Sequence, residues 1–215
     1  MSARAPPPPL VRIVDSALPR PAFARLARAI RGLGEAKLRR TYELTFWFDL
    51  GTPAALPEAA ILELRRHVTG SFAGAEWWLS RMRTSDVGVD FHRDRDNARF
   101  ARTGRTVHPA VSSVLFLNRC RGGHLVVVDA SPNEANPACA PDLRDADVVR
   151  PRPNRFAVFR GDLTHGVLDA NGEVPDGRLE TPTPLRLSLA VNWWRRRPEG
   201  VPEFTGRDYP SLRTP

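Results

Sequence analysis

Two histidines and an aspartate have the types and the spacing that metal binding requires. His92 and Asp94 lie two positions apart in residues 91–94 (Phe-His-Arg-Asp), and His165 lies in residues 161–166 (Gly-Asp-Leu-Thr-His-Gly). In an extended chain, residues i and i+2 face the same side, so His92 and Asp94 can reach one ion. Two imidazoles and one carboxylate fill one face of an octahedron and leave three positions open, which suits non-haem Fe(II).

The elements that must position these residues are short apolar runs bounded by Gly, Pro, Asn or Asp. From about residue 76 they follow one another without intervening helices, which predicts an antiparallel sandwich or barrel. Before them, periodicity predicts an α/β portion with strands at 10–14 and 41–50 and helices at 21–33 and 57–68. The later expected strands are residues 77–82, 87–91, 111–117, 124–128, 155–159, 166–168 and 185–194.

The segment 185–194 has the clearest strand pattern, with large apolar side chains at every second position. Arg186, Ser188 and Asn192 lie on its other face. One explanation is a half-buried strand whose polar face is in water. The other is a jelly-roll barrel in which this face lines a ligand cup, with Arg186 and Ser188 pointing into it together.

Several motifs in order along the chain resemble the Fe(II)/2-oxoglutarate-dependent dioxygenases, and within them the prolyl 4-hydroxylase-like branch. Residues 91–94 look like the first two iron ligands, and residues 154–167 look like the strand that leads to the distal histidine. Residues 113–125 resemble the branch's leucine-asparagine strand and glycine-glycine hairpin, and residues 185–189 resemble the strand whose basic residue binds the co-substrate. Residues 10–15 are similar to the branch's usual opening.

The resemblance implies a mainly β fold with flanking helices, built on a double-stranded β-helix, or jelly-roll, core. It implies Fe(II) held by the two histidines and the aspartate, and 2-oxoglutarate and O2 as co-substrates, with ascorbate as a candidate reductant. Decarboxylation of 2-oxoglutarate to succinate and CO2 is coupled to oxidation of a substrate, usually its hydroxylation. Arg186 would bind the distal carboxylate of 2-oxoglutarate in a two-pronged pair, and Ser188 would add a hydroxyl donor. Asn118 and Asn192 are further candidates for lining the cup.

Two features depart from the family pattern. Residues 81–85 carry no tyrosine, where many members place an aromatic hydroxyl that touches the co-substrate. Arg186 also lies farther from His165 than in the prolyl hydroxylases, with residues 169–184 as an enlarged hairpin loop. Arg178 is the alternative co-substrate residue, and Asp96 is the alternative to Asp94.

Length and composition indicate one soluble globular domain: the chain has 215 residues, of which 41% are hydrophobic and 26% charged. We expect a Pro-rich disordered tail at 1–9 and a single dioxygenase domain over 10–215, with its β-helix core at about 76–196. No stretch approaches the length of a membrane span, and the N-terminus lacks the apolar core of a signal peptide, which favours the cytoplasm. Cys120 and Cys139 are too few for a disulfide framework and are predicted to be free thiols.

The sequence leaves the substrate open. The formal charge of +8 is typical of a solvated basic surface, and it also allows attraction of nucleic acid or an acidic ligand. The loops 93–109 and 129–154 are expected to form the rim over the metal. An amino-acid, peptidyl or small-molecule substrate is the leading interpretation. Oxidative demethylation of nucleic acid is disfavoured, because the second arginine of those enzymes corresponds to Asn192 here. A cupin-like binding module without catalysis is the third alternative.

Overall fold

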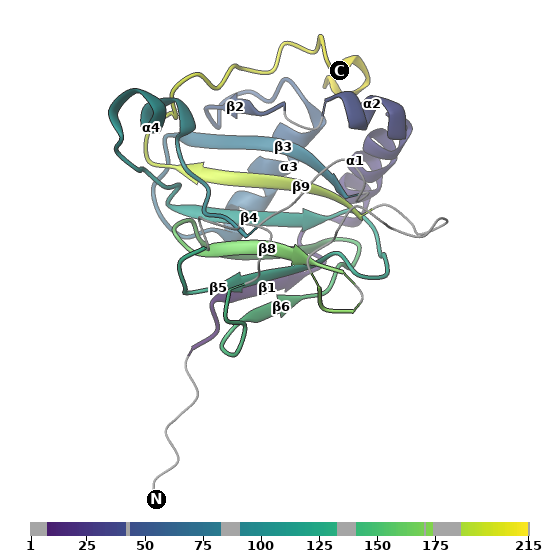
Figure 1. Ribbon diagram of the computed structural model, residues 1–215. Helices are drawn as coiled ribbons and strands as arrows, with labels where there is room; N and C mark the ends of the chain where they lie inside the picture. Colours follow the sequence, from purple (N-terminus) through teal and green to yellow (C-terminus); the bar gives the residue numbers. More distant parts are fainter. Residues whose placement is uncertain are drawn as a thin grey trace, which may run out of the picture.

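Two antiparallel β-sheets form the centre of the molecule (Figure 1). The computed structural model describes residues 8–41, 44–82, 91–132, 141–169, 171–173 and 186–214. The larger sheet has six strands in the order β1-β7-β4-β9-β3-β2, and the smaller has three in the order β6-β5-β8. The strands are β1 Val11–Asp15, β2 Phe46–Phe48, β3 Gly74–Met82, β4 Val111–Phe116, β5 His124–Val128, β6 Asp147–Val149, β7 Arg155–Arg160, β8 Thr164–Leu168 and β9 Arg186–Trp194.

The chain alternates between the two sheets along its length. It runs from β3 in the large sheet to His92, which bridges to His165 of β8 in the small sheet, and then back to β4. It continues through β5 and β6 in the small sheet, β7 in the large, β8 in the small and β9 in the large. From β3 onward the chain thus passes repeatedly between the two sheets, although β5 and β6 follow each other in the same sheet. This winding is that of a double-stranded β-helix, so the expected mainly β, jelly-roll fold is confirmed.

Strand β9 is buried along its whole length, on both faces. It pairs with β3 on one side and with β4 on the other, which places it in the middle of the large sheet. Its apolar face joins the main core through Leu187, Leu189, Val191 and Trp193. Its polar face is equally enclosed, since Arg186, Ser188 and Asn192 are all buried. Of the two explanations for the alternating pattern, the structure therefore supports the interior cup and not the solvated face.

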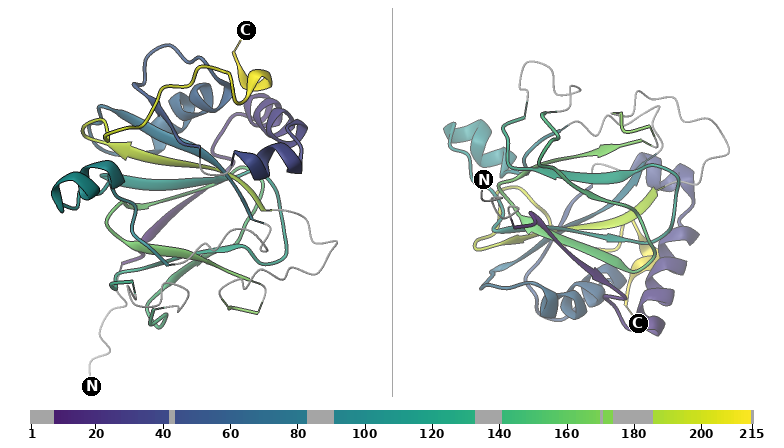
Figure 2. Two further views of the ribbon diagram at one scale, coloured as in Figure 1. Left: turned by 45° about the horizontal axis from the view of Figure 1, so that its top comes forward. Right: turned by 90° about the horizontal axis from the view of Figure 1, so that it is seen from below.

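Three helices pack against the large sheet on the side away from the small one (Figures 1 and 2). They are α1 Arg20–Gly32, α2 Glu35–Arg40 and α3 Leu56–Leu64, which continues into the 3-10 turn Arg65–His67. The apolar spacing of the sequence predicted α1 and α3. The residues that make this pattern, including Leu26, Ile30 and Ile61, are buried in the main core. The expected strand at 41–50 is reduced to β2, and a second 3-10 turn, Pro210–Leu212, lies near the C-terminus.

Both long segments that were predicted as loops contain regular structure. The segment 93–109 contains helix α4, Asn97–Thr103, whose first turn is capped by the Asp96 carboxylate accepting from Arg99 N. The helix ends at Gly104 in the left-handed conformation. The segment 129–154 contains β6, which pairs with β5. The loop predictions were wrong at these points because caps and edge pairing, rather than apolar periodicity, form both elements.

Some sequence predictions fall outside the described residues. They include the tail residues 1–7, most of the expected strand 87–91, Cys139 and Arg178. Among the helices that the structure does describe, none combines the length and the apolar character needed to cross a membrane.

Candidate metal centre and cavity

An antiparallel backbone bridge between the segment that follows β3 and strand β8 brings His92 and His165 together. The His92 N–H donates to the His165 carbonyl at 3.0 Å, and the His165 N–H donates to the His92 carbonyl at 2.9 Å. Directly opposed residues of an antiparallel pair project their side chains to the same face. The two imidazole rings accordingly lie 4.5 Å apart between centroids.

The carboxylate of Asp94 lies between the two imidazoles. Its Oδ1 is 3.5 Å from His92 Nε2, and its Oδ2 is 3.4 Å from His165 Nε2. One potential ligand atom from each residue lies within 4.8 Å of the others, the grouping expected of a shared ion. The structure thus brings together the three residues that the sequence predicted as metal ligands, His92, Asp94 and His165.

Neighbouring groups fix the orientation of these side chains. His165 Nδ1 lies 3.2 Å from the Leu163 carbonyl, which can only accept, so Nδ1 carries the proton and Nε2 is left to bind a metal. On the other side, the Ser112 hydroxyl lies 3.1 Å from Asp94 Oδ2 and 2.7 Å from Asn192 Oδ1. Asn192 also hydrogen-bonds to the Asp94 carboxylate. Ser112 of β4 and Asn192 of β9, both in the large sheet, therefore hold the Asp94 carboxylate in place.

The charge states of the site favour metal binding. Burial opposes ionisation of Asp94, but its interactions with His165, His92 and Asn192 outweigh burial, and the pKa of Asp94 is lowered. Burial lowers the pKa of His165, which favours the neutral imidazole, although the charge of Asp94 opposes this shift. A deprotonated carboxylate and a neutral imidazole are the forms that bind a metal ion at neutral pH.

Gly166, next to His165, is required by the packing of Phe91, next to His92. A Cβ at position 166 would lie 2.9 Å from the Phe91 ring, which is itself buried. The glycine therefore lets the strand that carries His165 approach the segment that carries His92. This explains why the sequence reads His-Gly at this point.

The polar residues at the other end of the β9 inner face form a second group. The Arg186 guanidinium is buried, lies 5.1 Å above the Phe116 ring, and has Nη1 3.5 Å from Ser80 Oγ. Ser188 is buried beside it and donates to the Ser80 carbonyl at 3.4 Å. Asn118, expected to line the cup, instead accepts from the Leu187 N–H at 2.9 Å and joins the end of β4 to β9.

A cavity of about 980 Å³ opens onto the metal centre. His92, Asp94 and Asn192 line it on one side, and residues of β3, α4 and the segments beside them complete it. Three residues of the site were not predicted from the sequence. Glu76 and Trp78 of β3 line the cavity, and Ser112 contacts the Asp94 carboxylate. The full lining is Thr45, Glu76, Trp78, Phe91, His92, Arg93, Asp94, Arg95, Asn97, Phe100, Thr106, His108, Ser131, Pro132 and Asn192.

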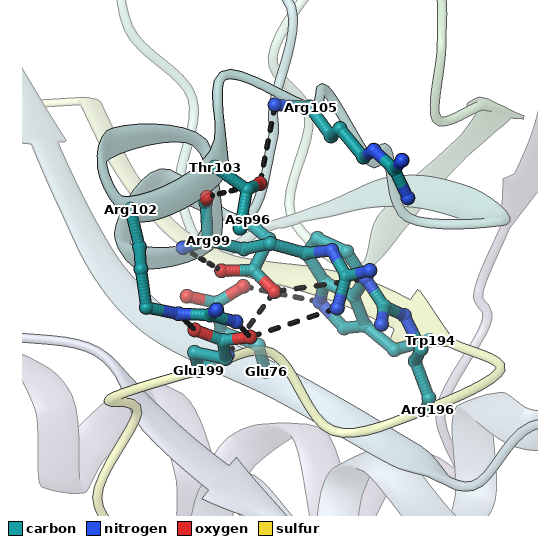
Figure 3. Close-up of polar contacts among 9 residues, drawn as sticks. All are labelled: Glu76, Asp96, Arg99, Arg102, Thr103, Arg105, Trp194, Arg196 and Glu199. Carbon is teal, nitrogen blue, oxygen red and sulfur yellow. Dashed lines mark hydrogen bonds and ion pairs between the residues drawn. The ribbon is translucent and has the colours of Figure 1, made fainter.

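Asp96 serves a different purpose from Asp94. It is buried, caps α4 through Arg99 N, and accepts from the Glu199 N–H at 3.2 Å. Figure 3 shows this carboxylate and that of Glu199 among the guanidinium groups of Arg99, Arg102 and Arg196. The structure therefore places Asp96 at the anchor of α4, outside the group formed by His92, Asp94 and His165.

His108 Nδ1 lies 2.6 Å from the Asp94 carbonyl, so this loop histidine supports the segment between His92 and α4. Cys120 is a free thiol as predicted, and burial raises its pKa.

Comparison with known proteins gives matches at the level of structure. No protein-family model and no curated protein sequence matches the chain. A 2OG-Fe(II) oxygenase-family oxidoreductase from Burkholderia pseudomallei is 15% identical with a TM-score of 0.49, covering 91% of this chain and 89% of that one. A prolyl-4-hydroxylase from Pseudomonas putida is 20% identical with a TM-score of 0.44, covering 87% and 89%.

A third similar structure is a prolyl hydroxylase from Trichoplax adhaerens in complex with a hypoxia inducible factor peptide fragment. It is 13% identical with a TM-score of 0.48, covering 86% of this chain and 84% of that one. The solved structures that resemble this chain thus include the groups named by the sequence resemblance, prolyl 4-hydroxylases and 2OG-Fe(II) oxygenases.

Proposed function

We propose that the protein is an Fe(II)- and 2-oxoglutarate-dependent dioxygenase that hydroxylates an amino-acid or peptidyl substrate. One observation carries the proposal: the Nε2 atoms of His92 and His165 lie within 3.5 Å of the two oxygens of one half-buried carboxylate, Asp94, at the edge of a large cavity. Two neutral imidazoles and one carboxylate on one side of an ion are the ligand set of non-haem Fe(II) oxygenases.

The chain's own residues fit such an ion. His165 is oriented by the Leu163 carbonyl and Asp94 by Ser112 and Asn192, so two of the three ligands are held in place before any metal arrives. When bound, Fe(II) supplies open coordination positions for 2-oxoglutarate and O2 and the redox chemistry that converts them to succinate and CO2. The protein contributes the three ligand side chains and a cavity beside them.

Arg186 is the proposed anchor for the distal carboxylate of 2-oxoglutarate. It lies on the same inner face of β9 as Asn192, which contacts Asp94, so the face runs directly from the co-substrate residue to the metal centre. A buried guanidinium binds a carboxylate strongly because the planar fork matches two oxygens and water is excluded. Ser188, two positions along the same face, offers a hydroxyl to the same ligand.

The substrate would enter through the cavity that α4 borders. Its volume is large enough for an amino acid, a small molecule or one side chain of a peptide. The residues that line the cavity include Asn97 and Phe100 of α4, Trp78 of β3, and Thr45. Excluding water from this space during the reaction would keep oxidising chemistry directed at the substrate.

The test is Fe(II)-dependent formation of succinate from 2-oxoglutarate by the purified protein, with and without a panel of amino acids and peptides. Asp94→Ala removes the central ligand and is expected to reduce succinate to background. Asp142→Ala is the matched control, because Asp142 is an exposed carboxylate paired only locally with Arg144. A non-catalytic binding module would form no succinate under any condition, and that result would contradict the proposal.

A further inference from the structure

Glu76 continues a row of polar side chains that crosses the large sheet at the metal centre. In the register of the sheet, Glu76 of β3 lies opposite Asn192 of β9, and Asn192 lies opposite Ser112 of β4. Ser112 and Asn192 both contact the Asp94 carboxylate. Glu76 is therefore the next residue of this row after Asn192, and its side chain lines the cavity.

Trp78 lies two residues further along β3 and lines the same cavity. Residues two apart on a strand share a face, so the Glu76 carboxylate and the Trp78 indole both belong to the cavity wall. A carboxylate beside an indole is a recognised chemistry for an ammonium or guanidinium group, because the carboxylate supplies a charge-assisted hydrogen bond and the ring face attracts the cation.

The Glu76 carboxylate is fixed in position by Trp194, the last residue of β9. The Trp194 indole Nε1–H donates to Glu76 Oε2 at 3.1 Å, as Figure 3 shows. The arginines of the neighbouring network are directed at other carboxylates: Arg99 at Glu199, 3.6 Å away, and Arg196 at Asp96, 4.0 Å away. A ligand in the cavity would thus meet an oriented acidic group.

The electrostatic setting of Glu76 supports the same conclusion. Burial, followed by the charge of Asp94, raises the pKa of Glu76 to about 7, although hydrogen bonds with Trp194 and Thr45 oppose the shift. A carboxylate that is costly to ionise in its own surroundings gains from a cation placed beside it. Cation binding at this point would offset the burial of the charge.

Arg93 and Arg95 also line the cavity, but both already have partners. Arg93 is committed to the wall, since Nε donates to Thr164 Oγ1 at 3.1 Å and Nη2 donates to the Ala130 carbonyl at 3.2 Å. Arg95 is exposed and stacks 3.8 Å above the Phe100 ring. The acidic residue Glu76 thus lines the cavity from β3, and the two arginines line it from the segment around Asp94.

We propose that the substrate carries a protonated amine or a guanidinium, and that Glu76 and Trp78 bind this cationic group. The inference rests on the proposed function and specifies the substrate class of the same site. A carbon near the cation would then face the metal centre, and its C–H bond would become C–OH. One oxygen atom of O2 enters the product and the other enters succinate, while 2-oxoglutarate loses CO2 and supplies the two electrons that balance the reaction.

Binding of charged probes and their neutral counterparts tests the proposal. Isothermal titration would compare L-lysine with L-norleucine and L-arginine with L-citrulline, each free and as the Nα-acetyl amide. Both the metal-free protein and the anaerobic Fe(II)- and 2-oxoglutarate-loaded protein would be titrated. At least one cationic probe is expected to bind about tenfold or more tightly than its neutral counterpart, the scale of one charge-assisted hydrogen bond.

Glu76→Gln is expected to abolish that preference. Glutamine keeps an oxygen that can accept from Trp194, so the fold should be retained while the charge is lost. Glu63→Gln is the matched control, because Glu63 is exposed on α3 and pairs with Arg66. Equal binding of charged and neutral probes, no binding of any probe, or a preference that survives Glu76→Gln would overturn the proposal. Succinate formation is measured in a separate assay. A protein that binds the cationic probes but forms no succinate would contradict the proposed function and not the cation site, and the reverse result would contradict only the cation site.

Discussion

Substituting Gly123 by alanine should weaken both the fold and co-substrate binding. Gly123 has φ +67°, and a Cβ there would lie 2.8 Å from Arg186 Cδ and 3.2 Å from Cys120 Sγ. Because Arg186 is buried, its side chain cannot swing aside into solvent. Gly104, after α4, has the same φ of +67° and no atom within 4 Å of its hypothetical Cβ. The two glycines therefore separate the backbone cost from the contact cost.

The expected magnitudes follow from this difference. An L-residue in the left-handed region costs about 1–2 kcal/mol, which both Gly104→Ala and Gly123→Ala incur. Forcing an extra carbon into a packed site costs a further ~1–3 kcal/mol, which only Gly123→Ala incurs. Denaturant unfolding should thus show a larger loss of unfolding free energy for Gly123→Ala by about 1–3 kcal/mol.

The same pair of variants tests the role of Arg186. A displaced guanidinium makes a poorer two-pronged contact, so the dissociation constant for 2-oxoglutarate should rise about tenfold or more in Gly123→Ala, equivalent to ~1.4 kcal/mol. In Gly104→Ala it should stay near the wild-type value. Equal losses of stability in the two variants would refute the packing argument, and unchanged 2-oxoglutarate binding in a destabilised Gly123→Ala would refute the assignment of Arg186.

Three further predictions concern the surroundings of the metal. Ser112→Ala should weaken Fe(II) binding about 10- to 100-fold by releasing the Asp94 carboxylate. The control is Ser113→Ala: the Ser113 hydroxyl contacts Val191 and not the site, so metal affinity measured by titration should be unchanged. Asp96→Ala should lower the unfolding free energy by about 1 kcal/mol or more through loss of the α4 cap, yet leave Fe(II) affinity within a few-fold of wild type; loss of metal binding would mean that Asp96 is a ligand after all. The third concerns pH: the folded protein holds the Glu76 proton more tightly than the unfolded chain, since its pKa rises from 4.5 to about 7, so the unfolding free energy of the metal-free protein should fall as pH rises across that interval. Glu76→Gln should flatten this dependence in urea titrations at several pH values, and an identical pH profile would count against the raised pKa.

The sequence was sufficient for the elements that carry strong periodicity. The alternation in 185–194 and the apolar runs around 111–117, 124–128 and 155–159 correspond to β9, β4, β5 and β7 with small shifts at their ends. These strands are buried on at least one face, so burial imposes the pattern that sequence reasoning detects. The grouping of His92, Asp94 and His165 followed from order and context, and the structure brings these residues together, while their binding of iron stays a prediction.

What the sequence could not supply depends on contacts between distant segments. Ser112 is an ordinary serine in an apolar strand until the register of β4 and β9 places it against Asn192 and Asp94. Glu76 likewise gains its importance from β3 lying beside β9. Helix α4 depends on a cap and on anchoring to Glu199, far along the chain, rather than on an apolar stripe.

Anaerobic titration of the protein with Fe(II) and 2-oxoglutarate tests the central claim most directly. The measurement follows the weak visible charge-transfer band that forms when both ligands share one centre, in the wild type, His165→Ala and Arg186→Ala. The account predicts a band in the wild type, none in His165→Ala, and in Arg186→Ala a band that needs far more 2-oxoglutarate to appear. Absence of the band in a folded wild-type protein, or an unchanged titration in both variants, would contradict it.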